Sequence, residues 1–193
     1  MGSSRVQVKC PSCQHSFLPA LDDVQSRAGK SARRKGHAFE RKVAKQLQDW
    51  WVISGQSYLF RRTPMSGGST LKDGWGLAGD IATTAPTFNW HLELKNAPGS
   101  FAGLHQLISA DKCKIWGWLN QAIHDCPPFN NVMLIVNRYD QPTWCITPRV
   151  SVIERLGLCG VDFFSFYSKR HDINLIIWSF DDMLKTSPQI WDK

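Results

Sequence analysis

The sequence has no apolar run of about eighteen residues, the length that a helix needs to cross a bilayer. Its N-terminus also lacks the pattern of a secretory signal peptide. These absences exclude a membrane-spanning or secreted protein, and we expect a soluble, cytoplasmic one. In that compartment the six cysteines stay reduced, which excludes a disulfide framework. A chain of 193 residues fits one ordinary domain with an appendage.

A second Cys-x-x-Cys pair is also missing. Cys10 and Cys13 have the spacing that lets two thiolates reach one Zn²⁺ ion, and His15 is a candidate third ligand. A complete site needs a distant ligand or a second subunit, and the alternative is a disordered or degenerate knuckle. The remaining cysteines are scattered and are predicted to be small buried apolar residues. They are Cys113, Cys126, Cys145 and Cys159.

Acidic residues are scarce near the N-terminus. Residues 1–47 carry ten Lys or Arg against three Asp or Glu, whereas residues 48–193 carry thirteen of each. The net charge of +7 therefore belongs to the N-terminal quarter, which predicts nucleic acid as the partner and an anionic membrane as the second choice. No Trp or Phe face accompanies the basic residues 27–35, which argues against the membrane. Residues 21–35 are poor in large apolar side chains and are predicted to form a linker.

An amphipathic helix is predicted to begin near Gly36. At about 100° per residue, one stripe of the helix is apolar and the opposite side is basic. The apolar stripe comprises Phe39, Val43, Leu47 and Trp50. Glu40 falls inside the apolar sector. A carboxylate that points toward a core is costly unless something binds it, so Glu40 is either a paired structural residue or a site residue.

Two strands joined by a short turn are predicted over residues 79–95. The second strand alternates, so His91, Glu93 and Lys95 share one face and three apolar residues share the other. We expect the apolar face in the core and the polar face next to Asp80 on the first strand. Two carboxylates and an ammonium are costly to desolvate together unless a divalent cation binds between the carboxylates. The alternative is an exposed ion pair that contributes about 0–1 kcal/mol.

A loop with five glycines is predicted over residues 61–79, after a short edge strand at residues 58–60. Long irregular loops in compact domains are usually functional. The side chains of this loop offer donors for phosphates, and its glycines let a DNA backbone come close. The donors are Arg61, Arg62, Ser66, Ser69 and Lys72. The alternative is a mobile surface loop with incidental charge.

The remaining sequence completes a mixed fold. A helix is predicted over residues 115–124, and two strands that pair with each other are predicted at residues 131–136 and 143–147. After residue 150 we expect a short helix, an aromatic patch that offers a dimer surface, a strand and a closing helix. Their acidic, aromatic and apolar residues suggest no further chemistry.

The acidic residues carry a resemblance to a known superfamily. The order Asp80, Glu93, Lys95 is the Asp…Glu-x-Lys signature of the PD-(D/E)XK nucleases, which the chain resembles over roughly residues 36–147. The stretch from Gly36 to Ala44, with Glu40 inside it, resembles the opening of archaeal and phage Holliday-junction resolvases. An Arg followed by a Ser-Gly segment before the catalytic Asp is a second resemblance to these enzymes.

The resemblance implies a restriction-endonuclease-like α/β fold, with a mixed central sheet flanked by helices, over residues 36–193. Residues 1–35 would form a zinc-knuckle-like segment and a basic arm. The implied activity is Mg²⁺- or Mn²⁺-dependent hydrolysis of DNA at Holliday junctions or other branches, in a phage or prokaryotic setting. A homodimer is the simplest way to cut two opposed strands.

The resemblance also implies roles for single residues. Asp80, Glu93 and the Leu94 carbonyl would hold the metal, with Glu40 ligating directly or through water, and Lys95 would orient a water molecule. Backbone phosphates would be bound by Arg33, Arg34, Lys35, Arg61 and Arg62. Gln121 matches a Trp-x-x-Gln-Ala-type segment of phage resolvase-like enzymes and is a candidate site residue, although such a Gln more often caps or solvates a helix.

Three alternatives stay open at this point. The first is a nuclease of another class, restriction-type or DNA-end-processing, although no sequence-reading helix is recognisable. The second is a non-catalytic DNA-binding protein on an inert nuclease fold, against which the intact set of acidic and basic residues argues. The third is a zinc-dependent regulatory or scaffold protein.

Overall fold

The structure is a computed structural model that describes residues 8–9, 16–17, 21–55, 57–63, 76–96, 113–127, 131–138 and 141–191. The chain divides into two compact units, Met1–Gly36 and His37–Lys193. In the first unit, β1 (Val8–Lys9) pairs antiparallel with β2 (Ser16–Phe17). Cys10, Cys13, His15, Ser66, Ser69 and Lys72 lie outside the described residues.

Helix α1 (Leu21–Val52) is longer than predicted, and its residues from His37 onward belong to the second unit. The stretch predicted as a linker, residues 21–35, is helical rather than irregular. It contains no proline and a single glycine, and it is rich in Arg, Lys and Ala, all of which favour helix. A low content of large apolar residues therefore did not distinguish a polar helix from an irregular segment.

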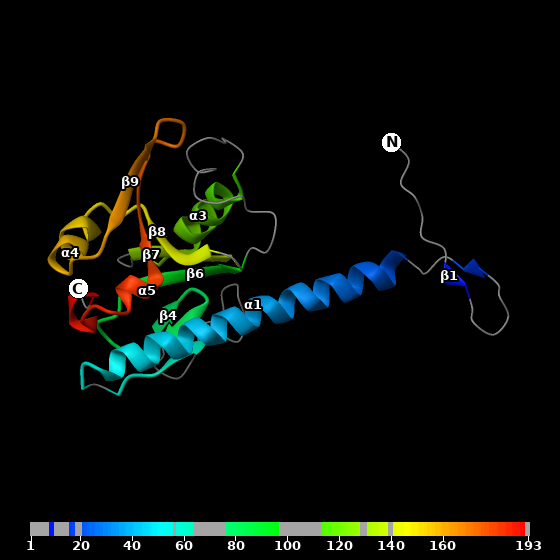
Figure 1. Ribbon diagram of the computed structural model, residues 1–193, viewed down its shortest axis with the longest axis horizontal. Coiled ribbons are helices and arrows are strands. Elements are labelled where there is room, and N and C mark those ends of the chain that lie inside the picture. The colour runs from blue at the N-terminus through cyan, green and yellow to red at the C-terminus, as the bar shows by residue number, and fades with distance from the viewer. Residues whose placement is uncertain are drawn as a thin grey trace. The chain divides into compact units, whose positions relative to one another are not determined.

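A five-stranded mixed sheet forms the centre of the second unit, in the order β6-β7-β8-β10-β9 (Figure 1). Its strands are β6 (Trp90–Asn96), β7 (Asn131–Arg138), β8 (Gln141–Thr147), β9 (Phe163–Ser168) and β10 (Ile173–Ser179). Strands β6 and β7 are parallel and the other pairs are antiparallel. A parallel pair needs a crossover connection, and the one between β6 and β7 includes α3 (Lys114–Asp125).

A smaller antiparallel sheet adjoins β6. It has the order β3-β5-β4, formed by β3 (Phe60–Arg62), β4 (Gly76–Ala78) and β5 (Ile81–Thr83). Arg61 and Arg62, predicted in the loop, therefore lie in a strand that begins two residues later than expected. Strand β5 pairs with β3 and β4, and one parallel bridge, from Gly79 to Leu92, joins this region to β6.

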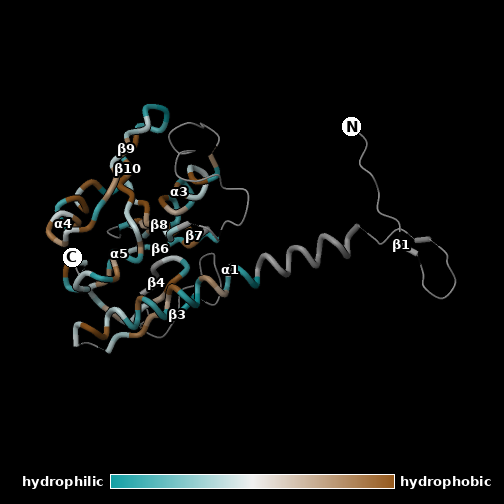
Figure 2. Tube along the Cα trace, in the orientation of Figure 1, coloured by the Kyte–Doolittle hydropathy of each residue, from teal (hydrophilic) through white to brown (hydrophobic). Residues whose placement is uncertain are grey.

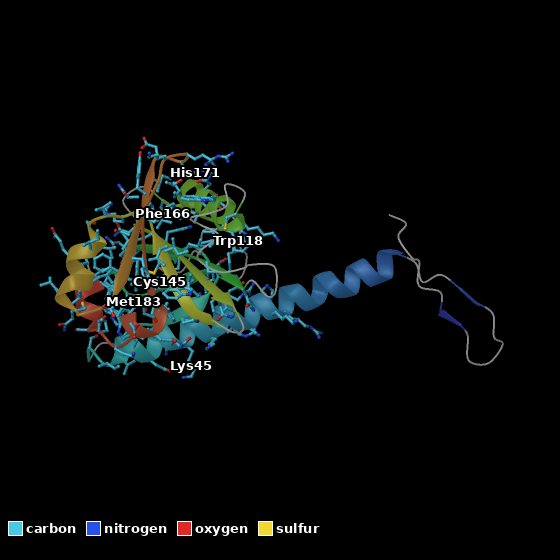
Figure 3. All side chains as sticks on the ribbon, turned by 45° about the horizontal axis from the view of Figure 1, so that its top comes forward. Lys45, Trp118, Cys145, Phe166, His171 and Met183 are labelled. Atoms are coloured by element: carbon cyan, nitrogen blue, oxygen red, sulfur yellow. The ribbon has the colours of Figure 1, made fainter. Side chains whose placement is uncertain are left out.

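One face of the central sheet packs against α1. The predicted apolar stripe of α1 is buried against the apolar residues of β6, together with α4 (Val152–Leu158), α5 (Phe180–Met183) and the 3-10 helix η1 (Pro188–Trp191). Figure 2 shows apolar and polar turns alternating along the described part of α1. Cys145 and Met183 lie inside this unit, whereas Lys45 is on the outer side of α1 (Figure 3).

Helix α3 covers the other face of the sheet. Its residues Ile115, Trp116 and Leu119 pack against the residues of β7, β8 and β10 that point away from α1. The predicted mixed α/β architecture, with a central sheet flanked by helices, is confirmed. Cys113 and Cys145 are buried as predicted, and Cys126 and Cys159 are half-buried. Within the described part of the chain, no helix is long and apolar enough to cross a membrane.

Candidate active site

Strand β6 presents two different faces, as its alternation predicts. Trp90, Leu92 and Leu94 are buried in the core under α1. Glu93 lies on the opposite face and is only 7% exposed. The Lys95 Nζ atom lies 2.5 Å from Glu93 Oε1 and donates a hydrogen bond to it. This pair is therefore more shielded from water than the exposed ion pair considered from the sequence.

Asp80 is fixed beside this strand by backbone contacts. Its N–H donates to the Leu92 carbonyl oxygen at 2.7 Å, and its Oδ2 atom accepts from the Leu94 N–H at 2.8 Å. On its other side, the Thr63 N–H donates to the Asp80 carbonyl oxygen at 3.0 Å. Asp80 immediately precedes β5 and is 7% exposed. These bonds hold the Asp80 backbone between Thr63 and β6, and its carboxyl group against β6.

Gly79 allows this close approach. Its φ is +73°, and a Cβ atom at this position would lie 2.2 Å from the Leu92 carbonyl oxygen. Any other residue would therefore displace the backbone of β6 or the residue that carries the first carboxylate. The Thr63 hydroxyl donates to the Gly79 carbonyl oxygen at 3.1 Å and holds the same segment from the side of β3.

The pKa of the Asp80 carboxyl group depends on its burial and on the charges around it. Burial, followed by the charges of Glu93 and Glu40, raises its pKa from 3.8 to about 7, while the Leu94 N–H and the charge of Lys95 oppose the rise. Glu40, Glu93 and Lys95 thus all lie close enough to act on Asp80. The structure brings together the four residues that the sequence analysis selected from three separate segments.

Glu40 is bound by a residue of β3. Its Oε2 atom accepts a hydrogen bond from Arg62 Nε, and Arg62 Nη2 lies 2.9 Å from His37 Nε2. The side chains of Arg62 and Glu40 are 22% and 16% exposed. The sequence analysis left open whether Glu40 is paired or part of a site, and the structure shows that it is paired. His37 was missed, although its position one helical turn before Glu40 places both on one face of α1.

His91 is a second residue to which the sequence analysis gave no role. It shares a face of β6 with Glu93, is 5% exposed, and has no hydrogen bond from either ring nitrogen within the described residues. Burial lowers its pKa, and the charges of Glu93 and Asp125 oppose that effect. Its ring packs against the Gly79 backbone, since its Cε1 atom is 3.2 Å from the position that a Cβ would take there.

The other predicted site residues are less closely connected. Arg61 is exposed and alternates with Arg62 along β3, so its side chain leaves the opposite face of the strand. Gln121 is exposed on α3 and makes no hydrogen bond with the acidic residues among those described. Arg34 and Lys35 are exposed residues of the first unit, and Arg33 is helical in α1.

The donor set suits a hard divalent cation. Asp80 and Glu93 are buried like charges, and one carboxylate oxygen of each makes no hydrogen bond within the described residues. No group of three His, Cys, Asp or Glu side chains that could hold a metal occurs in those residues. Mg²⁺ needs only one or two carboxylates from a protein and completes its coordination with water and phosphate oxygens. Asp80 and Glu93 therefore supply carboxylates suited to a hard divalent cation.

Comparison with known families supports the same conclusion. The family model described as "Phage putative PDDEXK endonuclease" matches residues 31–192, a range that includes Glu40, Asp80, Glu93 and Lys95. No curated protein and no solved structure matches the chain at a significant level. The chain therefore belongs to the phage PDDEXK endonuclease family, within the PD-(D/E)XK nuclease superfamily and its restriction-endonuclease-like fold.

Proposed function

We propose that this nuclease is a divalent-metal-dependent endonuclease that hydrolyses DNA at branched structures, with the four-way junction as its preferred substrate. The observation that supports metal-dependent hydrolysis most directly is the Asp80 carboxyl group, held against β6 beside Glu93 and Lys95. Two buried carboxylates next to an ammonium have the charges that phosphodiester hydrolysis requires.

The residues divide the chemistry between them. Asp80, Glu93 and the Leu94 carbonyl would hold Mg²⁺ or Mn²⁺. When bound, the metal would supply an activated water and offset charge on the phosphate. Lys95, whose Nζ is already directed at Glu93, would orient that water and stabilise the charge that develops as one ester P–O bond breaks. Glu40 would act at the edge of the site, where it is paired with Arg62.

The DNA would be held mainly through its backbone. Arg61 and Arg62 of β3, with Arg33, Arg34 and Lys35 of the N-terminal arm, are cations suited to phosphates. Such contacts position DNA without reading its bases, which favours recognition of shape over sequence. Branched DNA offers a distinctive arrangement of phosphates. Cutting two opposed strands of a junction would require two sites, and a twofold homodimer supplies them.

A cleavage assay tests this proposal. Labelled four-way junction and linear duplex with the same arm sequences are incubated with the protein in Mg²⁺ and, separately, in EDTA. We expect cleavage of the junction in Mg²⁺ alone, with slower cutting of the duplex. Equal rates on the two substrates would overturn the branched-DNA assignment and favour a restriction-type or end-processing nuclease.

Zinc at the N-terminus stays a separate prediction. Cys10 and Cys13 with His15 supply too few ligands for a closed tetrahedral site from one chain. Metal analysis of the purified protein, with a Cys10→Ser, Cys13→Ser double variant as the control, measures whether zinc is bound. Zinc in the wild type that is absent from the double variant is the expected result if the knuckle is intact.

A further inference from the structure

Arg62 is held by two residues of the same helical turn. Its Nε donates to Glu40 Oε2, and its Nη2 lies 2.9 Å from His37 Nε2. Because a guanidinium can only donate, the His37 Nε2 atom must accept, which places the ring proton on Nδ1. A neutral imidazole and a carboxylate thus bind two different edges of one guanidinium. This fixes the plane of Arg62 as well as its position (β3 lies beside α1 in Figure 2).

The remaining N–H groups of Arg62 have no partner among the residues that the structure describes. A guanidinium has five N–H groups, and the contacts with Glu40 and His37 occupy two of them. The other three make no hydrogen bond with the described residues. Arg62 lies opposite Ile81 in the β3–β5 pairing, and Ile81 directly follows Asp80. A cation with unused donors is therefore fixed next to the segment that carries the first carboxylate of the site.

The same contacts change the role expected for Glu40. Its charge reaches Asp80, because it contributes to the raised pKa of that residue. One of its oxygens, however, is occupied by Arg62, whose positive charge offsets its own. A carboxylate in this position serves a guanidinium more directly than it serves a metal. An anion that binds Arg62 would lie beside the segment that carries Asp80, because Arg62 is paired with Ile81.

Resting on the nuclease function proposed above, we propose that His37 and Glu40 are positioning residues that orient Arg62 to bind a phosphate of the DNA strand held at Asp80 and Glu93. Arginine presents its donors in a planar fork that matches phosphate oxygens, and a fork fixed in advance loses less entropy on binding. In this arrangement Arg62 contacts the substrate, whereas His37 and Glu40 act on the substrate through Arg62.

The test compares variants that keep or remove the acceptor for Arg62. His37→Gln keeps a side-chain acceptor and His37→Leu removes it. We expect His37→Leu to raise the KM for DNA roughly tenfold with little change in kcat, and His37→Gln to stay within about twofold of wild type. His124→Leu removes an exposed histidine of α3 and is the matched control. Circular dichroism and thermal melting check that each variant folds, and the Gln variant keeps the test valid if the Leu variant does not.

Two further measurements separate positioning from metal binding. In an Arg62→Ala background, His37→Leu should have no additional effect on KM, because it acts only through Arg62. Mn²⁺ affinity, measured by calorimetry, should fall at least tenfold in Asp80→Asn and stay within about twofold in Glu40→Gln. Asp49→Asn removes the carboxylate of an exposed α1 ion pair and serves as the control for Glu40→Gln.

The outcomes distinguish this inference from the function on which it rests. If Asp80→Asn leaves Mg²⁺-dependent cleavage intact, the proposed nuclease site is wrong and Arg62 has no active site to serve. If Asp80→Asn abolishes cleavage but His37→Leu still raises KM without Arg62, only the positioning role is overturned. Loss of Mn²⁺ affinity in Glu40→Gln equal to that in Asp80→Asn would also overturn it, and would make Glu40 a metal ligand.

Discussion

At the scale of single residues, Asp80 has surroundings that are unusual for a carboxyl group. It is buried, the charges of Glu93 and Glu40 raise its pKa, and its Oδ2 atom accepts a hydrogen bond from the Leu94 N–H. The protein maintains a carboxyl group where its ionised form is disfavoured. Such groups concentrate at functional sites, because a bound cation or substrate offsets the cost.

The free-energy cost of ionising the buried Asp80 carboxyl group predicts how the stability of the metal-free protein depends on pH. The pKa of Asp80 rises from 3.8 to about 7 on folding. The folded state therefore binds more protons than the unfolded state between these values, and its stability falls as pH rises through this range. In EDTA, Asp80→Asn should match wild type at about pH 4 and exceed it at about pH 8, by on the order of 3 kcal/mol. Urea unfolding at both pH values measures the difference.

Excess Mg²⁺ should reduce that advantage of the variant at the higher pH, because only wild type gains from binding the ion. If Asp80→Asn were more stable than wild type by the same amount at both pH values, the account of Asp80 would be contradicted.

Gly79 supports a second prediction at this scale. Gly79→Ala should destabilise the protein by more than about 2 kcal/mol and abolish cleavage, because of its positive φ and the clash with the Leu92 carbonyl. Gly157→Ala is the matched control. Gly157 lies in α4 with nothing within 4 Å of an added Cβ, so alanine should stabilise the helix by about 0.5–1 kcal/mol. Thermal unfolding of both variants would contradict the account if they shifted the midpoint equally.

At the scale of elements, α1 links the core to the site. Its apolar stripe packs on the central sheet, while Glu40 and His37 reach Arg62 of β3. The stability of this helix and the geometry of the site therefore depend on the same packing.

A substitution in the α1 stripe tests this dependence. Leu47 is completely buried against the sheet. Leu47→Ala should therefore lower the free energy of unfolding by about 2–5 kcal/mol. Lys45, on the outer side of α1 in Figure 3, pairs with the exposed Asp49. Lys45→Ala should therefore change the free energy of unfolding by less than about 0.5 kcal/mol. Denaturant titration gives both values, and comparable losses would show that α1 is not anchored as described.

Local periodicity explains which elements could be predicted from the sequence. The alternation of β6 and the stripe of α1 mark the apolar side chains that pack in the core, so both were predicted with the correct faces. The contact between Arg62 and Glu40 joins residues 22 positions apart, and its geometry depends on how β3 packs against α1. Periodicity could not predict such tertiary contacts. It therefore missed the position of Arg62 in a strand, the role of His37 and the backbone hydrogen bonds that hold Asp80.

At the scale of the whole molecule, charge and chemistry are found in different segments. The surplus of seven positive charges belongs to residues 1–47, whereas Asp80, Glu93 and Lys95 lie in a part of the chain with balanced charge. We expect the basic segment to set affinity for DNA and its salt dependence, and the acidic cluster to set the rate of hydrolysis.

Neutralising the basic segment tests this division. Replacing Arg33, Arg34 and Lys35 with Gln should weaken DNA binding and reduce the slope of log affinity against log salt by up to about 3. The cleavage rate at saturating DNA should stay within about threefold of wild type. The control variant replaces the exposed Lys45, Lys169 and Lys185 with Gln. If both triple variants lose the same slope, net charge rather than this segment determines affinity.

The most direct test of the central claim is a Mg²⁺ titration of DNA cleavage by wild type and Glu93→Gln, with DNA affinity measured in parallel. The account predicts that wild type cuts DNA only when Mg²⁺ is present, and that Glu93→Gln binds DNA with similar affinity but cuts at least a hundredfold more slowly. Cleavage by Glu93→Gln at the wild-type rate, or cleavage by wild type in EDTA, would contradict it.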